Sequence, residues 1–181
     1  SLRLHKIVEN TIVVFCSDNG ATSLGNNGAL RGVKGTDFEG GHRVPCVVQW
    51  PARYPQGQVN RQLIMAMDWM PTVLGITGLT QHAVRSLDGR NLTKQIEGTR
   101  DLTERTVIWN EKTIRRGIWK LMLPQKQLNE LSLFKLDEDL SEKHNLAAKY
   151  PELVKQLGAE LTRMNEQNNA SATTQPITEP N

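Results

Sequence analysis

The stretch Val13–Pro51, VVFCSDNGATSLGNNGALRGVKGTDFEGGHRVPCVVQWP, decides the fold of this chain. An apolar run that is typical of a strand leads directly into Asp18, Asn19 and Gly20, and a second apolar run closes the stretch. Between the two runs lies a glycine-rich segment that presents Lys34. Continuous apolar runs without alternation are typical of strands that are buried on both faces of a parallel sheet. The stretch therefore predicts an α/β layer with polar groups at the end of a strand.

Composition excludes two classes of protein. The chain has 181 residues, a formal net charge of +3 and 38% hydrophobic residues, which is enough for a globular core. Its lysines and arginines form no basic stripe with interleaved aromatic residues, so we expect no nucleic-acid partner. No apolar run approaches the roughly 20 residues of a membrane-spanning helix.

The first structural part should be residues 1–98, the end of an α/β layer. Residues 2–8 have the pattern of a helix end, and residues 11–16 and 44–50 have the pattern of strands. Asp68 is a suitable N-cap for a helix with Pro71 in its first turn and Gly78 as its stop. A turn at Asp88-Gly89 should be followed by a short helix.

The second part should be residues 99–166, a small α+β unit. Short strand-like runs separated by polar turns indicate an antiparallel meander, and Pro151 opens a segment with the 3.6-residue period of an amphipathic helix. The tail, residues 167–181, is polar and has no apolar period, so we expect it to be disordered. The three strand-like runs are residues 106–109, 114–123 and 131–136.

Asp18 and Asn19 are candidate metal ligands. Hard cations such as Ca²⁺ and Mg²⁺ prefer carboxylate, amide and water oxygens, and Gly20 allows the tight turn that brings two such side chains together. Asp, Asn and Gly are also ordinary residues of a turn that ends a strand, which is the alternative on these residues alone. Two ligands cannot complete a Ca²⁺ site, which takes six to eight oxygens.

Lys34 is the candidate cation for an anionic substrate. Glycines on both sides allow a ligand to approach the backbone, and an ammonium group there can stabilise negative charge as it develops. A solvated loop lysine is the alternative. Farther along, Arg43 and Glu39 should form an ion pair that holds the loop, and His42 is a candidate for a substrate subsite.

Cys16 and Cys46 are the two cysteines of the chain, and they could form a disulfide or remain free. Both lie in apolar, strand-like runs, where a free cysteine behaves as a small hydrophobic residue. This setting favours two thiols in the core.

The order of the motifs resembles that of the sulfatase family of the alkaline phosphatase superfamily. ENTIVVFCSDNG resembles the family's strand and metal-binding turn, and LRGVKGTDFEGGHRVPCVVQWP resembles its lysine loop. MDWMPTVLGITG, SLDGRNLTKQIEG, RRGIWKLM and LFKLDEDLSEKHNLAAKYPELVKQL resemble later segments in the same order. The resemblance implies the C-terminal part of an alkaline-phosphatase-like α/β sandwich, followed by a small α+β subdomain with an antiparallel sheet and one packed helix.

The resemblance also implies an activity and a set of site residues. The intact parent would be a sulfuric ester hydrolase with a formylglycine nucleophile and a divalent cation, Ca²⁺ or alternatively Mg²⁺. Asp18 and Asn19 would bind the metal, and Lys34 would act in catalysis by contacting the sulfate. The family's catalytic histidines lie upstream of this segment, so the resemblance gives His42 no catalytic role. The substrate would be a small-molecule or glycan sulfate ester, and the protein would be exported to the periplasm, the lysosome or the cell exterior.

The resemblance leaves part of the site unaccounted for. The family makes formylglycine from Cys or Ser in an upstream Cys/Ser-x-Pro-x-Arg motif, and neither Cys16 nor Cys46 lies in such a motif. We therefore expect the nucleophile and the remaining metal ligands to lie upstream, and this chain alone to be inactive. The alternatives are a phosphodiester or phosphonate hydrolase of the same superfamily and a truncated, non-catalytic sulfatase-like protein.

Overall fold

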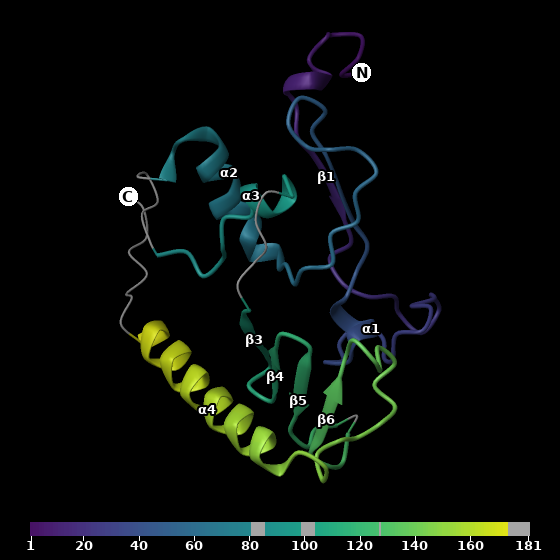
Figure 1. Cartoon of the computed structure of the whole chain (residues 1–181), viewed down its shortest axis with the longest axis vertical. Helices are drawn as coiled ribbons and strands as arrows, with labels where there is room; N and C mark the ends of the chain where they lie inside the picture. The colour runs from purple at the N-terminus through teal and green to yellow at the C-terminus, as the bar shows by residue number, and fades with distance from the viewer. Residues whose placement is uncertain (81–85, 99–103, 127, 174–181) are drawn as a thin grey trace. The chain divides into compact units, whose positions relative to one another are not determined.

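The structure, a computed structural model, describes residues 1–80, 86–98, 104–126 and 128–173, which form two compact units (Figure 1). The first unit comprises Ser1–Cys16 and Cys46–Arg105, and the second comprises Ser17–Pro45 and Thr106–Asn181. The predicted boundary at residue 98 is close to the break that follows Arg105. Residues 17–45, however, were predicted to belong to the first part, and they pack with the second unit instead.

A two-stranded ribbon begins the first unit. β1 (Val13–Cys16) pairs with β2 (Cys46–Gln49), so both predicted strands are confirmed. Their predicted parallel direction is wrong, because the pair is antiparallel, and all four residues of β1 are exposed in this chain. Phe15, for example, is 72% exposed. Apolar runs without alternation need cover on both faces, and the described part of this unit does not supply it for β1.

The helices of the first unit are short. The predicted helix over residues 2–8 is replaced by turns and a 3₁₀ helix, η1 (Val8–Asn10). η2 (Ala66–Asp68) leads into α2 (Trp69–Thr77), which ends at Gly78 in the left-handed conformation (φ +71°), as predicted. α3 (Thr93–Ile96) is the short helix expected after the Asp88-Gly89 turn.

Asp68 precedes α2 as predicted, but its side chain does not cap the helix. Its fully buried carboxylate instead accepts hydrogen bonds from the backbone N–H groups of Met65 (2.7 Å) and Arg90 (2.8 Å). It also pairs with Nη1 of Arg105 at 2.6 Å. Asp68 therefore joins three segments of the first unit through one buried charge.

The second unit is built on a four-stranded antiparallel meander in the order β3-β4-β5-β6, as predicted. One expected strand, residues 114–123, is in fact a hairpin, because Gly117 adopts a left-handed conformation (φ +56°) and reverses the chain. The strands are β3 (Thr106–Trp109), β4 (Thr113–Arg116), β5 (Trp119–Met122) and β6 (Ser132–Lys135).

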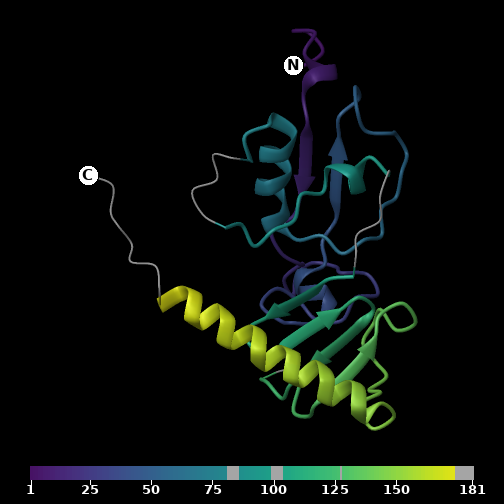
Figure 2. The ribbon, with the colours of Figure 1, turned by 60° about the vertical axis from the view of Figure 1, so that its left-hand side comes forward.

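One face of this sheet is covered by α4 (Pro151–Thr173), which runs diagonally across the strands in Figure 2. Ile114, Leu121 and Leu133 are opposite one another in the register and fully buried, and they pack with Leu157 and Leu161 of the helix. Because side chains alternate along a strand, this apolar row assigns the intervening residues to the other face.

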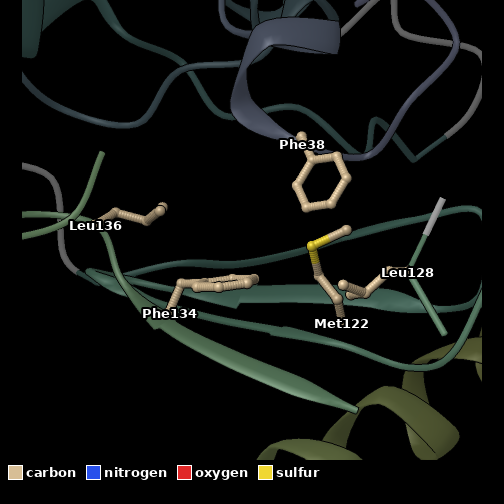
Figure 3. Close-up of a cluster of buried hydrophobic side chains, with 5 residues drawn as sticks. All are labelled: Phe38, Met122, Leu128, Phe134 and Leu136. Atoms are coloured by element: carbon tan, nitrogen blue, oxygen red, sulfur yellow. The ribbon is translucent and has the colours of Figure 1, made fainter. Parts of the chain in front are cut away.

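The other face receives residues 17–45. Phe38 points toward Met122 and Phe134 on the side of the sheet opposite α4 (Figure 3), and together with Leu128 and Leu136 these residues form a buried cluster. The glycine-rich segment is therefore fixed on a sheet that follows it in sequence by more than 60 residues.

α4 continues beyond the predicted end of the ordered chain. It extends to Thr173, so residues 167–173 are helical and the prediction of a disordered tail is wrong there. Residues 174–181 lie outside the described part. Among the described helices, none has both the length and the apolarity that crossing a membrane requires.

Candidate active site

The turn that follows β1 is closed by backbone and hydroxyl contacts. The Ser17 hydroxyl donates to the carbonyl of Asn19 (2.8 Å), and the N–H of Gly20 donates to the carbonyl of Gly41 (2.9 Å). Gly20 is buried, and a Cβ atom there would lie 1.7 Å from the carbonyl oxygen of Gly40. Only glycine allows this approach, so the position of the Asp18-Asn19 turn depends on the absence of a side chain at residue 20.

A second set of hydrogen bonds places Lys34 beside this turn. The N–H of Lys34 donates to the carbonyl of Ala21 at 2.9 Å. Asn27 links Ala21 to the glycine on the N-terminal side of Lys34, because its Oδ1 accepts from the N–H of Ala21 (2.8 Å) and its Nδ2 donates to the carbonyl of Gly32 (2.9 Å). Gly32 and Gly35 on either side of Lys34 have positive φ angles of 84° and 85°, which the looped path requires.

These contacts bring together Asp18, Asn19 and Lys34, which line one open hollow of about 460 Å³. Asp18 and Lys34 are exposed, and within the described part of the chain neither side chain forms a hydrogen bond or an ion pair. Opposite charges thus share one hollow without neutralising each other. The complete lining is Ser17, Asp18, Asn19, Gly20, Ala21, Thr22, Asn26, Asn27, Lys34, Val44 and Pro45.

The donor set suits a hard cation but does not enclose one. Asp18 supplies a carboxylate and Asn19 an amide oxygen, the oxygen types that Ca²⁺ and Mg²⁺ take. Among the described residues, His, Cys, Asp and Glu form no group of three or more that could hold a metal ion. A cation at this turn would therefore need further ligands.

A buried charge cluster holds the same segment of the chain at Glu39. The Nζ of Lys120 is 3.0 Å from Oε1 of Glu39 and 2.8 Å from Oε1 of Glu142, and all three side chains are fully buried. The second carboxylate oxygen of Glu142 accepts the backbone N–H of Glu39 at 2.7 Å. One lysine of β5 thus fixes α1 (Glu39–His42), the short helix whose Gly41 carbonyl accepts the Gly20 N–H.

Glu39 collects positive charge from three directions. Besides Lys120, its carboxylate is 3.3 Å from Nη1 of Arg115 and 3.4 Å from Nη1 of Arg43, so the predicted pairing of Arg43 with Glu39 is confirmed. Burial alone would raise the pKa of the Glu39 carboxyl, but the charges of Lys120 and Arg115 outweigh it and lower that pKa. Glu39 is therefore ionised at neutral pH.

Glu142 reaches the same lysine from an unusual backbone. It has a positive φ of 52°, a conformation that residues other than glycine seldom adopt. Burial raises the pKa of its carboxyl, and the Lys120 ammonium only partly offsets this. Its carbonyl accepts a hydrogen bond from Nη1 of Arg31 (2.8 Å), whose guanidinium lies over the ring of Phe38. Glu142 thus anchors the glycine-rich segment at two points.

His42 lies in the charge cluster and is not among the residues that line the hollow. Its ring stacks on Trp109 with centroids 4.4 Å apart, and its Nε2 is 3.3 Å from Nζ of Lys120. Burial, followed by repulsion from Lys120, lowers the pKa of His42 to about 4, so the ring is neutral at pH 7. A substrate contact by His42 stays a prediction.

Asp37 completes the attachment and was not expected from the sequence. Its buried carboxylate accepts hydrogen bonds from the Thr113 hydroxyl (2.8 Å) and from the Asn110 amide. One feature of the sequence did indicate that charged groups bind on the face of the sheet that carries Met122. Lys120 lies between Trp119 and Leu121 in a strand whose alternation places it on the same face as Met122.

Comparison with known proteins gives a consistent result. The Sulfatase family model matches residues 2–79. The chain is 40% identical over 110 residues to N-acetylgalactosamine-6-sulfatase of Canis lupus familiaris. This match covers 58% of this chain and 21% of the relative. It is 34% identical over 114 residues to steryl-sulfatase of Mus musculus, and this match covers 58% of this chain and 18% of the relative. The chain therefore matches only about a fifth of the length of these curated relatives.

A solved structure supports the fold. The crystal structure of Ps i-CgsB in complex with k-i-k-neocarrahexaose superposes with a TM-score of 0.74 at 28% identity, over 90% of this chain and 38% of that one. The predicted fold class, an alkaline-phosphatase-like α/β fold, is confirmed by this likeness.

The space at Gly20 yields a first prediction. Replacing Gly20 with Ala should lower the free energy of unfolding by about 1–3 kcal/mol, because the new methyl group overlaps the Gly40 carbonyl. Urea denaturation followed by circular dichroism measures the change. The matched control is Gly158→Ala in α4, where no atom lies within 4 Å of the new Cβ and no loss is expected. A Gly20→Ala variant as stable as the original chain would contradict the tight contact.

The charge cluster yields a second prediction. Lys120→Met should lower the free energy of unfolding at pH 7 by about 3–5 kcal/mol, because two buried carboxylates lose their shared cation. Without Lys120 the pKa of the Glu39 carboxyl is raised in the folded state, and that of Glu142, which is already raised, rises further. The deficit should therefore shrink as the pH falls toward the pKa of an unfolded glutamate, about 4.3. Urea denaturation at several pH values measures both effects.

Two controls accompany this prediction. Lys112→Met removes an exposed lysine and should change stability by less than about 0.5 kcal/mol. The triple variant Lys120→Met, Glu39→Gln, Glu142→Gln removes the unpaired charges and should recover at least half of the loss. A deficit for Lys120→Met that does not depend on pH would mean that lost packing, and not lost charge compensation, dominates.

Proposed function

We propose that this chain, which matches the Sulfatase family model over residues 2–79, is the C-terminal portion of an enzyme that hydrolyses sulfate esters. The observation that carries the proposal is the hollow in which Asp18, Asn19 and Lys34 meet. In the same segment, Asp37 and Glu39 are buried and bonded to the sheet, whereas Asp18 and Lys34 are exposed and have no charged partner within the described chain. The free charges are available for a ligand.

Asp18 and Asn19 would hold one side of a divalent cation, Ca²⁺ or alternatively Mg²⁺. When bound, such a cation and a formylglycine from the upstream part of the parent would supply Lewis-acid and nucleophilic chemistry at the sulfur. Gly20 supports this role, because its contact with Gly40 fixes the turn and leaves the side chains of Asp18 and Asn19 toward the hollow.

Lys34 would bind a sulfate oxygen and stabilise the negative charge that develops on the leaving oxygen. A fixed cation placed where charge grows is commonly the largest single contribution to catalysis of such transfers. Lys34 is suited to this role because the Ala21 carbonyl and the glycines on both sides hold its backbone, so that only the side chain needs to be ordered by a substrate.

The substrate class follows from what the relatives share. One matched relative is by name a sugar sulfatase and another is a steryl-sulfatase, so the common element is the sulfate group. We assign this group to the hollow and leave the rest of the ester, small molecule or glycan, to residues outside the matched part. We further propose that the parent is exported and that this chain alone has no turnover.

Lys34→Ala in the intact parent should lower kcat/KM for an aryl sulfate by at least about 100-fold, comparable to the loss of one oxyanion donor. Steady-state kinetics measures the change. Lys112→Ala, an exposed lysine outside the hollow, is the matched control and should have less than a twofold effect, about the scatter of a neutral surface change.

Two outcomes would contradict the proposal. A loss of less than about fivefold in Lys34→Ala would remove the proposed role of the lysine. Faster turnover of an aryl phosphate diester than of the aryl sulfate by the unmodified parent would favour the phosphodiesterase alternative, for which the same hollow could bind the phosphoryl group.

Asp18→Asn should weaken binding of Ca²⁺ to the intact parent by at least about tenfold, because the site loses one of its anionic ligands. Isothermal titration calorimetry measures this without reference to activity. Asp137→Asn, an exposed carboxylate after β6, is the control and should leave Ca²⁺ affinity unchanged. Equal Ca²⁺ affinity of Asp18→Asn and the unmodified protein would exclude Asp18 from the ligands.

A further inference from the structure

Cys16 and Cys46 lie directly opposite each other at the end of the β1–β2 ribbon. The register pairs their Cα atoms, and both thiols are free and exposed in the structure. The expectation of two buried thiols is therefore wrong, because the ribbon leaves this end of both strands open. The two cysteines are 30 residues apart in the sequence but are neighbours across the ribbon.

The pairing type favours a covalent link. The N–H of Ser17 donates to the carbonyl of Pro45 at 3.4 Å, which makes residues 17 and 45 a hydrogen-bonded pair of the ladder. Pair types alternate along an antiparallel ladder, so Cys16 and Cys46 form a non-hydrogen-bonded pair. In such a pair the Cα atoms approach to about 4.5 Å, within the range of roughly 4.4–6.8 Å that a disulfide bridges.

The electrostatics of Cys46 agree with this proximity. The pKa of its thiol is raised, first by partial burial and then by the charge and the hydrogen bonding of the Cys16 sulfur. No other cysteine occurs in the chain to compete for either thiol.

The two cysteines stand at the two ends of the segment that carries the candidate site residues. Cys16 immediately precedes the segment 17–45, and Cys46 immediately follows it. This segment carries Asp18, Asn19 and Lys34. A link between the two cysteines would tie the entry and the exit of the segment together without touching the hollow that it carries, since neither cysteine lines that hollow.

We propose that Cys16 and Cys46 form a cross-strand disulfide that closes the base of the 17–45 segment. The oxidant is a small disulfide of the oxidised-glutathione class. One protein thiolate attacks it and displaces one glutathione thiolate, leaving a mixed disulfide. The second protein thiolate then attacks the protein sulfur of that bond and releases the second glutathione. The balance is one dithiol and one oxidised glutathione in, and one protein disulfide and two reduced glutathiones out.

Peptide mapping of the intact protein tests the proposal. The protein is equilibrated in glutathione buffers of graded ratio, quenched in acid, alkylated and digested with trypsin without reduction. Trypsin places Cys16 in the peptide 7–31 and Cys46 in the peptide 44–53. The expected product is these two peptides joined, lighter by two hydrogens than their sum, and detection by mass does not depend on cysteines elsewhere in the protein.

A register-shifted variant is the matched control. The double change Cys46→Val, Val47→Cys keeps the composition but moves the thiol opposite Phe15, where alternation turns it to the other face of the ribbon. The equilibrium constant for joining the two cysteine peptides should fall at least about tenfold in this variant, toward the value of the unmodified protein in urea, where only chain connectivity brings the thiols together.

The test compares the equilibrium constant for joining the two cysteine peptides in the native protein, in urea and in the register-shifted variant. A native equilibrium constant at least about tenfold above the value in urea supports it. Equal constants in the native and denatured protein, or equal constants in the native protein and the register-shifted variant, would overturn it. Two glutathione adducts in place of the joined peptides would also overturn it. Cys16→Ser should give the single adduct at Cys46, which shows that glutathione reaches this thiol.

Discussion

The second unit depends on one buried ammonium group. Lys120 lies between two buried carboxylates, one from the glycine-rich segment and one from the turn after β6. Such a lysine is costly to bury, and it is stable here because Glu39 and Glu142 surround it and Arg115 supports Glu39. Through Glu39 it determines where α1 lies, and α1 in turn holds the backbone of the Asp18-Asn19 turn.

The two faces of the sheet use different physical means. α4 is attached by a row of aliphatic side chains, whose attraction does not depend on direction. The 17–45 segment is attached by ion pairs and hydrogen bonds from Asp37 and Glu39, with Phe38 as its apolar anchor. Directional contacts are appropriate for a segment that has little regular secondary structure, because they fix the orientation as well as the position of its backbone.

The sequence predicted local features well. Periodicity located the meander and α4, and turn residues located Gly78. The motif around Asp18 and the loop around Lys34 were expected to act together, and they line one hollow. The contacts that hold the loop could not be predicted, because Glu39 meets Lys120 across 81 residues and Glu142 across 103 residues. No local period records a contact of that range. The direction of the β1–β2 pairing was also missed, since an apolar run shows burial propensity but not the direction of its partner.

The long span of these contacts has a consequence for the order in which the protein is made. Glu39 leaves the ribosome 103 residues before Glu142, and at about 5–20 residues per second this gap lasts roughly 5–20 s. Until Glu142 emerges, the segment that carries Asp18 and Lys34 lacks the complete set of sheet and carboxylate contacts that hold it. The candidate site is therefore encoded early but assembled late, and the nascent chain must keep a glycine-rich, charged stretch in solution until the last strand and its turn have emerged.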